Sequence, residues 1–364
     1  MPGAPTDRRR NPHEAVLYDS DEEFLGVVVP FLQEGAAVGE PCPVALGSST
    51  TGLVRAAVAN TTGLSFLDDR YDRPVSVIRS NRELLTALLT DGASQIRVVS
   101  EAPDPGVGGR WDGWARYEAA INRAYAEFPL WGLCAYDTRI TPGPVLDDVA
   151  RTHPHLATVN GCWINPRYQD PAEFLTRRPP SQADPVETAP VPVIDLMDPT
   201  PAAARDAVHT NMTRPDTVRP DTVRPDTVRP DPTVPSTLQI RAPQPAPPQR
   251  DTPPLDPSDI QHLVVAVSEA VTNVVSHGRP PVRFRRWTAP DRIVATVSDR
   301  SDGPADPFAG LLPGSNTCSA GLGLWLTHQL CSHVTLDTTD EGFTIRLIVG
   351  TPQPGRSGHA LNNA

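Results

Sequence analysis

The sequence predicts an α/β protein with two folded domains, and three observations support this fold class. Short apolar runs alternate with amphipathic segments between residues 13 and 175. A proline-rich repeat begins at residue 213, where no packed structure is expected. From residue 258 to residue 350 the order of the elements is different, with a helix and two strands followed by another helix and two strands. We therefore expect a three-layer α/β/α domain with a mainly parallel sheet, followed by a two-layer α/β sandwich.

The first domain is predicted over residues 13–175, where strands and helices alternate. Its apolar runs are short and rich in β-branched residues, as in buried strands. The segments between them repeat apolar residues every three or four positions, which is helical spacing. Alternation of this kind favours a parallel sheet covered on both faces. The predicted strands are 15–19, 42–47, 75–80, 96–101 and 130–137, and the predicted helices are 21–39, 50–60, 81–92 and 113–128.

A proline-rich region follows the first domain. Residues 176–190 are expected to be a linker, and from residue 213 the chain repeats TVRPD. Proline at every fifth position blocks helix, and the alternating Arg and Asp keep the segment in water. We expect residues 213–257 to form an extended, mobile spacer; a docking site for a partner that reads proline motifs is the alternative. Residues 1–12 and 353–364 are expected to be disordered.

The second domain is predicted over residues 191–352, with the repeat inserted as a long surface loop. A strand at 191–197 and a helix at 200–212, with Pro201 in its first turn, precede the repeat. After the repeat, helices on one face of a mixed sheet are expected. These later elements are a helix at 259–278 that ends at Gly278, strands at 282–287 and 292–299, a glycine- and proline-rich stretch at 300–321, a helix at 322–333, and strands at 334–338 and 342–350.

Composition excludes several classes of function. The net charge is −11 and no basic face is evident, which argues against direct nucleic-acid binding. The chain has no lysine, so a Walker-type phosphate loop and Schiff-base chemistry are excluded. No apolar run reaches the ~18 residues of a membrane span, and the N-terminus lacks an apolar signal core. Five scattered cysteines without paired metal-ligand spacing are expected to be free thiols in a reducing cytoplasm.

A polar stripe crosses the predicted helix at 259–278. Glu269, Asn273 and His277 follow one another at four-residue intervals, so they share one helical face. Valines at 264, 267, 271 and 274 make the opposing apolar stripe. By itself this pattern most often marks the solvated face of an amphipathic helix. Its meaning depends on the segments that follow it.

Three segments of the second domain occur in a recognisable order. EAVTN (269–273), SDRSDG (298–303) and SAGLGLWL (319–326) resemble the N, G1 and G2 boxes of the GHKL, or Bergerat-fold, ATP-binding family. The resemblance covers about residues 258–350. Because no histidine-bearing dimerisation helices precede these boxes, the chain looks most like the anti-sigma-factor serine kinases within that family. The resemblance implies a Bergerat two-layer fold that binds ATP with Mg²⁺.

The residue types on the helix fit that chemistry. The carboxamide of Asn273 offers one oxygen to an octahedral Mg²⁺, whose other ligands are phosphates and waters. Glu269, one turn earlier, can deprotonate a water or a serine hydroxyl that attacks the γ-phosphate. In the family that the chain resembles, the matching carboxylate is the catalytic base and the matching asparagine holds the metal. We interpret His277 as a structural or helix-end contact outside this pair.

The other two boxes predict nucleotide contacts. Asp299 ends a strand and matches the family aspartate that accepts a hydrogen bond from the adenine amino group. Gly321 and Gly323 precede a helix, where backbone amides bind phosphate oxygens. By the same resemblance, Thr344 matches the threonine that supports the adenine contact on the final strand. Gly303 retains the last glycine of the G1 box.

One position departs from the family pattern. Ser301 stands where the family has the first glycine of D-x-G-x-G. Its Cβ is expected to crowd the adenine side if the backbone there needs an unusual angle, and nucleotide binding would then be weaker. Residues 304–320 correspond to the lid over ATP, short and loose as in the serine-kinase branch.

The first domain resembles a different family. The segments 13–47, 114–125, 133–137 and 151–156 resemble the MEDS sensory domain, a RecA-like α/β module. Where RecA-like ATPases carry a phosphate loop, this chain reads GSSTTGLVRAA, which lacks the glycine pattern and the lysine. We therefore expect no nucleotide hydrolysis in this domain, and the resemblance implies that it senses a small ligand. The polar and aromatic residues available for a pocket are His13, Tyr18, Tyr117, Glu118, Asn122, Tyr136, Asp137 and His153.

Together the two resemblances imply a cytoplasmic regulator with a sensory input and an ATP-binding output. The output is expected to sequester a sigma factor and, with Mg-ATP, to phosphorylate a serine of an anti-anti-sigma (STAS-type) partner. A homodimer is compatible with this role. Two alternatives stay open: a nucleotide-responsive binding module without catalysis, which Ser301 favours, and a two-component histidine kinase. A DNA-binding effector sensor is disfavoured by the charge and by the missing helix-turn-helix pattern.

Overall fold

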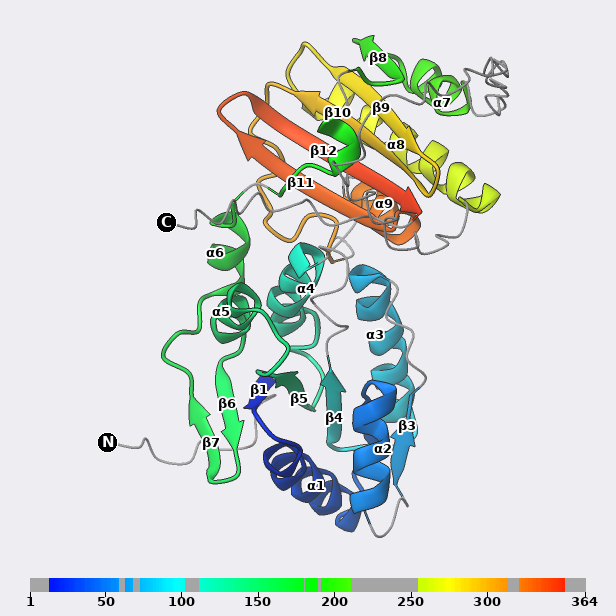
Figure 1. The fold of residues 1–364 in the computed structure, drawn as a ribbon. Helices are drawn as coiled ribbons and strands as arrows, with labels where there is room; N and C mark the ends of the chain where they lie inside the picture. Colours follow the sequence, from blue (N-terminus) through cyan, green and yellow to red (C-terminus); the bar gives the residue numbers. More distant parts are fainter. Residues whose placement is uncertain are drawn as a thin grey trace, which may run out of the picture.

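The computed structural model describes residues 13–58, 63–67, 73–101, 111–179, 181–188, 191–210, 255–312 and 321–350. Two sheets divide these residues into an N-terminal and a C-terminal domain, which lie one above the other in Figure 1. The first sheet is mainly parallel and the second is antiparallel, and both carry helices, so the predicted α/β fold class is confirmed. Residues 1–12, 353–364 and most of the predicted spacer at 213–257 lie outside the described residues. The last residues of that spacer are described, and they are not disordered: Leu255 packs against the core of the C-terminal domain and a helix begins at Pro257.

The sheet of the N-terminal domain has seven described strands: β1 (His13–Tyr18), β2 (Cys42–Ala45), β3 (Leu64–Phe66), β4 (Ile96–Glu101), β5 (Leu130–Asp137), β6 (His155–Thr158) and β7 (Gly161–Ile164). Their order is β3-β2-β4-β5-β1-β6-β7. Every described pairing is parallel except that of β6 with β7, which is antiparallel. β1 therefore lies between β5 and β6, where both of its edges are hydrogen-bonded.

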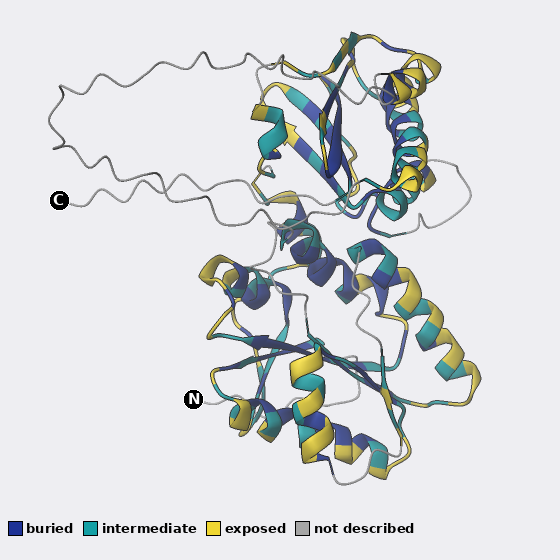
Figure 2. Cartoon of the chain, turned by 45° about the vertical axis from the view of Figure 1, so that its right-hand side comes forward, coloured by how far each residue is buried: buried dark blue, intermediate teal, exposed yellow. Residues whose placement is uncertain are grey.

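The described helices of this domain lie on both faces of the sheet: α1 (Asp21–Ala37), α2 (Ser48–Ala57), α3 (Pro74–Thr90), α4 (Trp111–Ala124), α5 (Gly143–Thr152) and α6 (Pro171–Thr176). α1 and α2 share a core that includes Phe24 and Val54. α3 and α4 share a second core that includes Ile78 and Ile121. Figure 2 shows buried strands between helices whose outer sides are exposed. These are the three predicted layers.

The segment at 75–80 is helical, so the strand predicted there is wrong. α3 begins at Pro74, and proline suits a first helical turn because the N–H that it lacks has no helical partner there. Val75, Ile78 and Leu85 are buried along one side of the helix. A short apolar run does not by itself separate a strand from a buried helix. The edge strand next to β2 is instead β3, which no predicted strand covers.

The sheet of the C-terminal domain has five described strands: β8 (Ile194–Met197), β9 (Arg283–Ala289), β10 (Arg292–Asp299), β11 (His333–Thr339) and β12 (Gly342–Gly350). Their order is β11-β12-β10-β9-β8, and each described pairing is antiparallel. The mixed sheet that was expected is therefore not formed. β9–β10 and β11–β12 are joined by tight turns, and such hairpins are antiparallel by their connection.

Three described helices pack on one face of this sheet: α7 (Pro201–His209), α8 (Pro257–His277) and α9 (Leu322–Leu330). Leu263 and Val271 of α8 share a core with Phe284 and Leu347 of the sheet. α7 packs against α8, and β8 pairs with β9, so both elements ahead of the repeat contribute to this domain. None of the described helices combines the length and apolarity needed to cross a membrane.

Residues 181–188, inside the predicted linker, pack on the other face of the C-terminal sheet. They include a short 3-10 helix at Pro185–Thr188. Asp184 accepts hydrogen bonds from the Arg292 guanidinium at 2.9–3.1 Å, and all of these polar atoms are buried. Glu187 accepts in the same way from Arg346, at 2.6 Å. Buried ion pairs therefore hold this segment against the sheet.

The two domains contact each other through α3 and α4 on one side and α9 with residues 304–312 on the other (Figure 1). Phe308 is buried in the same apolar cluster as Trp114 of α4. The Arg73 guanidinium donates to the Gln329 carbonyl at the end of α9, at 2.6 Å. The N-terminal domain thus supports a segment that also borders the functional site described next.

Candidate functional site

α8, the end of β10 and the start of α9 surround a pocket of about 360 Å³ in the C-terminal domain. α8 packs against α9 and against β10, which brings the three segments singled out in the sequence into one place. Of the predicted site residues, those that line the pocket are Asn273, Asp299, Gly303 and Gly321. Glu269 lies on α8, one helical turn before Asn273, and its side chain lies against Gly323 of α9.

Glu269 and Asn273 face the first turn of α9. A Cβ on Gly323 would lie 2.6 Å from Glu269 Oε2 and 3.4 Å from Asn273 Nδ2. Glycine permits this close approach, because a side chain at position 323 would push the carboxylate away. The four-residue interval on α8 puts both polar side chains beside the same helix start. The N and G2 segments therefore meet as the sequence predicts.

Asp299 is buried at the end of β10, and its two carboxylate oxygens have different environments. Oδ1 accepts backbone hydrogen bonds from Ser301 at 2.5 Å and from Arg279 at 3.2 Å. Oδ2 is buried and has no hydrogen-bond partner among the described residues. A Cβ on Gly278 would lie 2.8 Å from Oδ2, so only glycine at that position avoids a clash with this oxygen. One oxygen is thus a fixed support, and the other is an acceptor without a partner beside the pocket.

The loop after Asp299 needs glycine at position 303 but not at position 301. Gly303 has a φ of +76°, in the left-handed region that favours glycine. Ser301 is not among the described residues with a positive φ, so its Cβ causes no backbone strain. The Ser301 hydroxyl accepts a hydrogen bond from the Gly303 amide at 3.3 Å. The expected crowding from an unusual backbone angle at Ser301 therefore does not occur.

Replacing Gly303 by alanine is expected to lower the free energy of unfolding by about 1–3 kcal/mol. The new Cβ would need the left-handed conformation and would lie 2.5 Å from Phe343 Cδ2. Urea-induced unfolding measures the change. Gly39→Ala is the matched control, because Gly39 has a φ of +77° and nothing lies within 4 Å of its Cβ position. If Gly303→Ala destabilises the protein no more than Gly39→Ala does, Gly303 does not pack tightly against Phe343.

The start of α9 offers backbone amides to the pocket. Gly321 is the N-cap residue with a φ of +108°, and no described side chain caps the helix there. The first amides of a helix have no partner within the helix, so they can bind an anion. The predicted lid, residues 304–320, is described only up to residue 312, and Pro304, Ala305 and Gly310 of that part line the pocket.

Thr344 lies on the opposite face of the sheet from the pocket. Its neighbours Phe343 and Ile345 line the pocket, and successive strand residues point to opposite faces. In the β10–β12 pairing, Asp299 is opposite Phe343, whereas Thr344 is opposite Ser298. This register gives no support to the adenine contact predicted for Thr344.

Several residues of the pocket were not predicted as site residues. Phe343, Ile345 and Leu324 supply apolar surface, and Gly278 adjoins Asp299. The alternating apolar pattern of the last strand could have predicted Phe343 and Ile345 as pocket residues. Strand residues that face the core beside Asp299 also face the pocket. Gly278 was interpreted only as a helix end. His277 is exposed and lies at the edge of the pocket.

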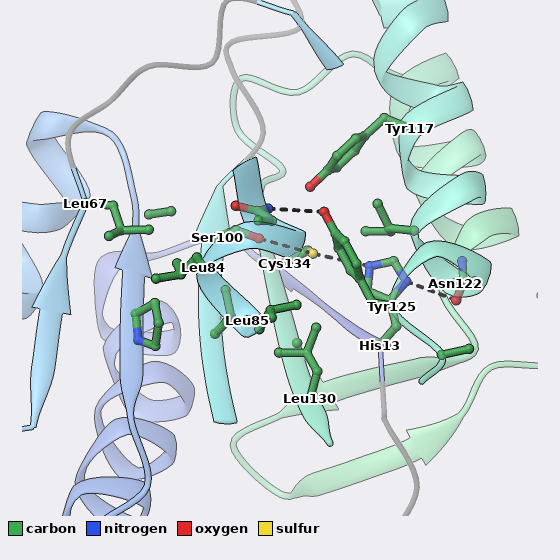
Figure 3. A pocket seen from close by; sticks show the side chains of 17 residues that line it. His13, Leu67, Leu84, Leu85, Ser100, Tyr117, Asn122, Tyr125, Leu130 and Cys134 are labelled. Atoms are coloured by element: carbon green, nitrogen blue, oxygen red, sulfur yellow. Dashed lines mark hydrogen bonds between the residues drawn. The ribbon is translucent and has the colours of Figure 1, made fainter. Parts of the chain in front are cut away.

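A second, smaller cavity of about 90 Å³ lies inside the N-terminal domain (Figure 3). Leucines such as Leu84, Leu85 and Leu130 line much of it, and His13 and Cys134 line it as well. Of the eight residues predicted for a sensory pocket, those that line it are His13, Tyr117 and Asn122. Three more, Glu118, Tyr136 and His153, adjoin His13 directly or through one another. Tyr18 and Asp137 lie apart, at the ends of β1 and β5.

Comparison with known proteins gives a match for each domain. Residues 12–154 match the model of the MEDS family, described as the methanogen/methylotroph DcmR sensory domain. Residues 250–349 match the model of the histidine kinase-like ATPase domain. No curated protein matches the chain.

Solved structures that resemble parts of the chain come from two bacteria. The crystal structure of the RsbU and RsbW domains of Rv1364c from Mycobacterium tuberculosis is 25% identical over 28% of this chain and 25% of that chain, with a TM-score of 0.19. The chain thus spans about a quarter of the length of that structure. The NMR structure of the histidine kinase domain of the E. coli osmosensor EnvZ is 22% identical over 29% of this chain and 73% of that chain, with a TM-score of 0.20.

The family matches agree with the two sheets and with the two pockets described above. The MEDS match covers the strands and helices around the smaller cavity, and the ATPase match covers α8 to β12 around the larger pocket. The chain therefore combines a segment that matches the MEDS family model with a second segment that matches the model of the histidine kinase-like ATPase domain.

Proposed function

We propose that the pocket of the C-terminal domain binds Mg-ATP and that the protein is a signal-responsive, anti-sigma-type serine kinase. The observation that carries this function is the buried Asp299 Oδ2, an acceptor without a described partner, in a pocket that also reaches the start of α9. An adenine amino group is a donor that suits Oδ2. The match to a histidine kinase-like ATPase domain supports the choice of ATP.

The pocket has a separate place for each part of the nucleotide. Asp299 would hold the adenine at one end, against the apolar surface of Phe343 and Ile345. The backbone amides at the start of α9 would receive the phosphates, with Gly321 and Gly323 allowing close approach. Asn273 would offer its side-chain oxygen to Mg²⁺, which neutralises phosphate charge when bound. A few placed polar groups in an otherwise apolar pocket are typical of small-molecule sites.

Glu269 would act on the attacking hydroxyl and not on the bound nucleotide. Its carboxylate lies beside Gly323, outside the pocket lining but within one turn of Asn273. A base at that position can accept the proton of a serine hydroxyl as its oxygen attacks the γ-phosphate. Phosphoryl transfer depends mostly on positioning and on charge neutralisation, so no further nucleophile from this chain is required.

The proposed partners follow from the resemblance of the three boxes to the anti-sigma-factor serine kinases. A STAS-type anti-anti-sigma protein would supply the serine, and a sigma factor would be the protein that is sequestered. A protein partner also suits the net charge of −11, which disfavours direct binding to nucleic acid.

The N-terminal domain is proposed to sense a small ligand in its 90 Å³ cavity and to act on the nucleotide pocket through the domain contact. α4 borders both the cavity, through Tyr117, and the cluster that holds Phe308. The neighbours of Phe308 in the chain, such as Ala309 and Gly310, line the nucleotide pocket. A small shift of α4 can therefore be transmitted to the nucleotide pocket through side chains that pack against one another.

The test uses the full chain, radiolabelled Mg-ATP and STAS-domain proteins of the same cell. We expect label on a serine of one STAS protein, stable to acid, and co-purification of a sigma factor with the unmodified chain. Acid-labile phosphohistidine on the chain itself would instead support a two-component histidine kinase. ATP binding without transfer to any protein would leave a nucleotide-responsive binding module.

A further inference from the structure

Four side chains that can bind metal meet inside the N-terminal domain, although they come from separate elements. They are His13 of β1, Glu118 of α4, Cys134 of β5 and His153, which follows α5. Their ligand atoms all lie within 4.8 Å of one another. The exposed fraction of the side chain is 12% for His13 and lower for Glu118 and His153. Figure 3 shows His13 between Cys134 and Asn122.

Hydrogen bonds from the surrounding chain fix which nitrogen of each neutral histidine faces the cluster. His153 Nδ1 lies 2.9 Å from the Val149 carbonyl, which can only accept, so Nδ1 carries the proton and Nε2 presents a lone pair. Asn122 Nδ2 donates to the Glu118 carbonyl at 2.9 Å, which leaves Asn122 Oδ1 as the acceptor for His13 Nδ1 at 3.2 Å. His13 Nε2 therefore presents a lone pair as well.

The cluster brings these lone pairs together with a carboxylate oxygen. Glu118 Oε2 lies 3.5 Å from His13 Nε2 and 3.5 Å from His153 Nε2. The Tyr136 hydroxyl donates to the other oxygen, Glu118 Oε1, at 2.9 Å. Among the described residues, neither Glu118 Oε2 nor His153 Nε2 has a hydrogen-bond partner, although both atoms are buried. Buried polar atoms without partners are rare and costly, and facing acceptors are best satisfied by a cation.

Three of the distances between ligand atoms, and the charges of the ligands, suit a transition-metal site. Zn²⁺ binds nitrogen and oxygen ligands at about 2.0–2.2 Å and sulfur at about 2.3 Å, so neighbouring ligand atoms of a tetrahedron are about 3.3–3.7 Å apart. His13 Nε2 lies 3.5 Å from Glu118 Oε2 and 3.4 Å from Cys134 Sγ. A thiolate and a carboxylate together balance one divalent cation, which a buried site requires. We propose that His13, Glu118, Cys134 and His153 bind a divalent transition-metal ion such as Zn²⁺.

The ligand types and their supports favour this class of metal. Two imidazoles and a thiolate suit Zn²⁺, Co²⁺ or Fe²⁺, whereas Mg²⁺ and Ca²⁺ prefer oxygen ligands. Asn122 and the Val149 carbonyl accept hydrogen bonds from the two histidines, and the Tyr136 hydroxyl donates one to Glu118, so three of the four ligands are oriented as outer partners orient them in known metal sites. Because His13 and Cys134 also line the cavity, the ion would stabilise the wall that a sensed ligand touches.

A proton shared within the cluster is the competing explanation. Burial disfavours a charge on His13, but Cys134 and Glu118 outweigh burial and raise the pKa of His13 to about 10. The contact of His153 Nδ1 with the Val149 carbonyl leaves no hydrogen on Nε2 of the neutral ring. A protonated His13 still leaves His153 Nε2 facing Glu118 Oε2 without a hydrogen between them, whereas one metal ion satisfies both atoms.

The test uses the full chain without an affinity tag, stripped with a chelator and titrated with Co²⁺ and then with Zn²⁺. We expect one Co²⁺ per chain, with the absorption of a thiolate-to-cobalt charge transfer, and displacement of Co²⁺ by Zn²⁺. Cys134→Ser should remove this absorption and weaken Zn²⁺ binding about 100-fold or more. Cys42→Ser is the matched control, because Cys42 is a buried free thiol outside the cluster and should leave both properties unchanged.

His153→Gln tests a second ligand that contributes no thiolate absorption. It should weaken Zn²⁺ binding to a similar degree and shift the cobalt spectrum without removing the charge-transfer absorption. Circular dichroism shows whether each variant is folded. If Cys134→Ser does not fold, the Zn²⁺ affinity of His153→Gln tests the metal site in its place. A wild type that takes up no Co²⁺ would show that protons alone hold the cluster, and folded variants that bind as tightly as the wild type would equally overturn the metal site. Neither result depends on the nucleotide pocket.

Discussion

Replacing Asp299 by asparagine is expected to weaken Mg-ATP binding about 10- to 150-fold, the range for losing a hydrogen bond to a charged group. Asparagine can keep the two backbone bonds that Oδ1 accepts from Ser301 and Arg279, so the fold should survive. The buried Oδ2 becomes an NH₂ group, which points a donor at the donating amino group of adenine. Isothermal titration calorimetry measures the affinity, and circular dichroism checks the fold.

Asp302→Asn is the matched control for this substitution. It makes the same chemical change in the same loop, but the Asp302 side chain is 87% exposed. Its effect on Mg-ATP affinity should stay within about twofold, because exposed charges contribute little. Asp299→Asn should also lower the preference for ATP over GTP, since guanine presents a carbonyl oxygen where adenine has its amino group. Unchanged ATP affinity in Asp299→Asn would mean that this carboxylate does not read the base.

Glu269→Gln is expected to slow transfer of phosphate to the protein partner about 10²- to 10⁴-fold, the usual contribution of a general base. Glutamine keeps the size of the side chain beside Gly323 but cannot take up the serine proton. Mg-ATP affinity should stay near the wild-type value, because Glu269 does not line the pocket. Radiolabel transfer and calorimetry on the same preparation separate the two effects.

Glu341→Gln serves as the control for the loss of one negative charge. Glu341 is exposed in the turn between β11 and β12, so its replacement should change neither transfer nor binding. Full transfer by Glu269→Gln would contradict the base role. A loss of ATP binding in that variant would show that Glu269 holds the nucleotide or the α8–α9 contact instead.

Local pattern was sufficient to predict most of the elements. The valines of α8 recur every three or four positions, which is the spacing of a helix, and the apolar residues of β12 alternate, which is the spacing of a strand. Each pattern fits only one type of element. The run at 75–80 was predicted as a strand and is helical, because apolar residues on a short segment fit both periods. Residues 181–188 were predicted as linker, yet they dock through Asp184 and Glu187. Their partners Arg292 and Arg346 lie more than a hundred positions away, beyond any local pattern.

The candidate nucleotide site was predictable because its residues lie in three ordered segments. Glu269 and Asn273 are separated by one helical turn, and the glycines directly precede α9, so sequence order translates into position. Thr344 was predicted to face the adenine, but it is one residue further along the strand than Phe343 and therefore points to the opposite face of the sheet. Of the cluster proposed to bind metal, His13, Glu118 and His153 were predicted as pocket residues, but Cys134 and a metal site were not. His13 and Cys134 become neighbours only when β1 and β5 pair.

Calorimetric titration of the wild-type chain of 364 residues with ATP, in the presence and absence of Mg²⁺, tests the central claim most directly. The pocket formed by α8, β10 and α9 predicts one ATP per chain, bound at micromolar to sub-millimolar concentration and more weakly once Mg²⁺ is removed. Absence of any binding at millimolar ATP with Mg²⁺ would contradict the account, since Asp299, Asn273 and the start of α9 would then have no common ligand.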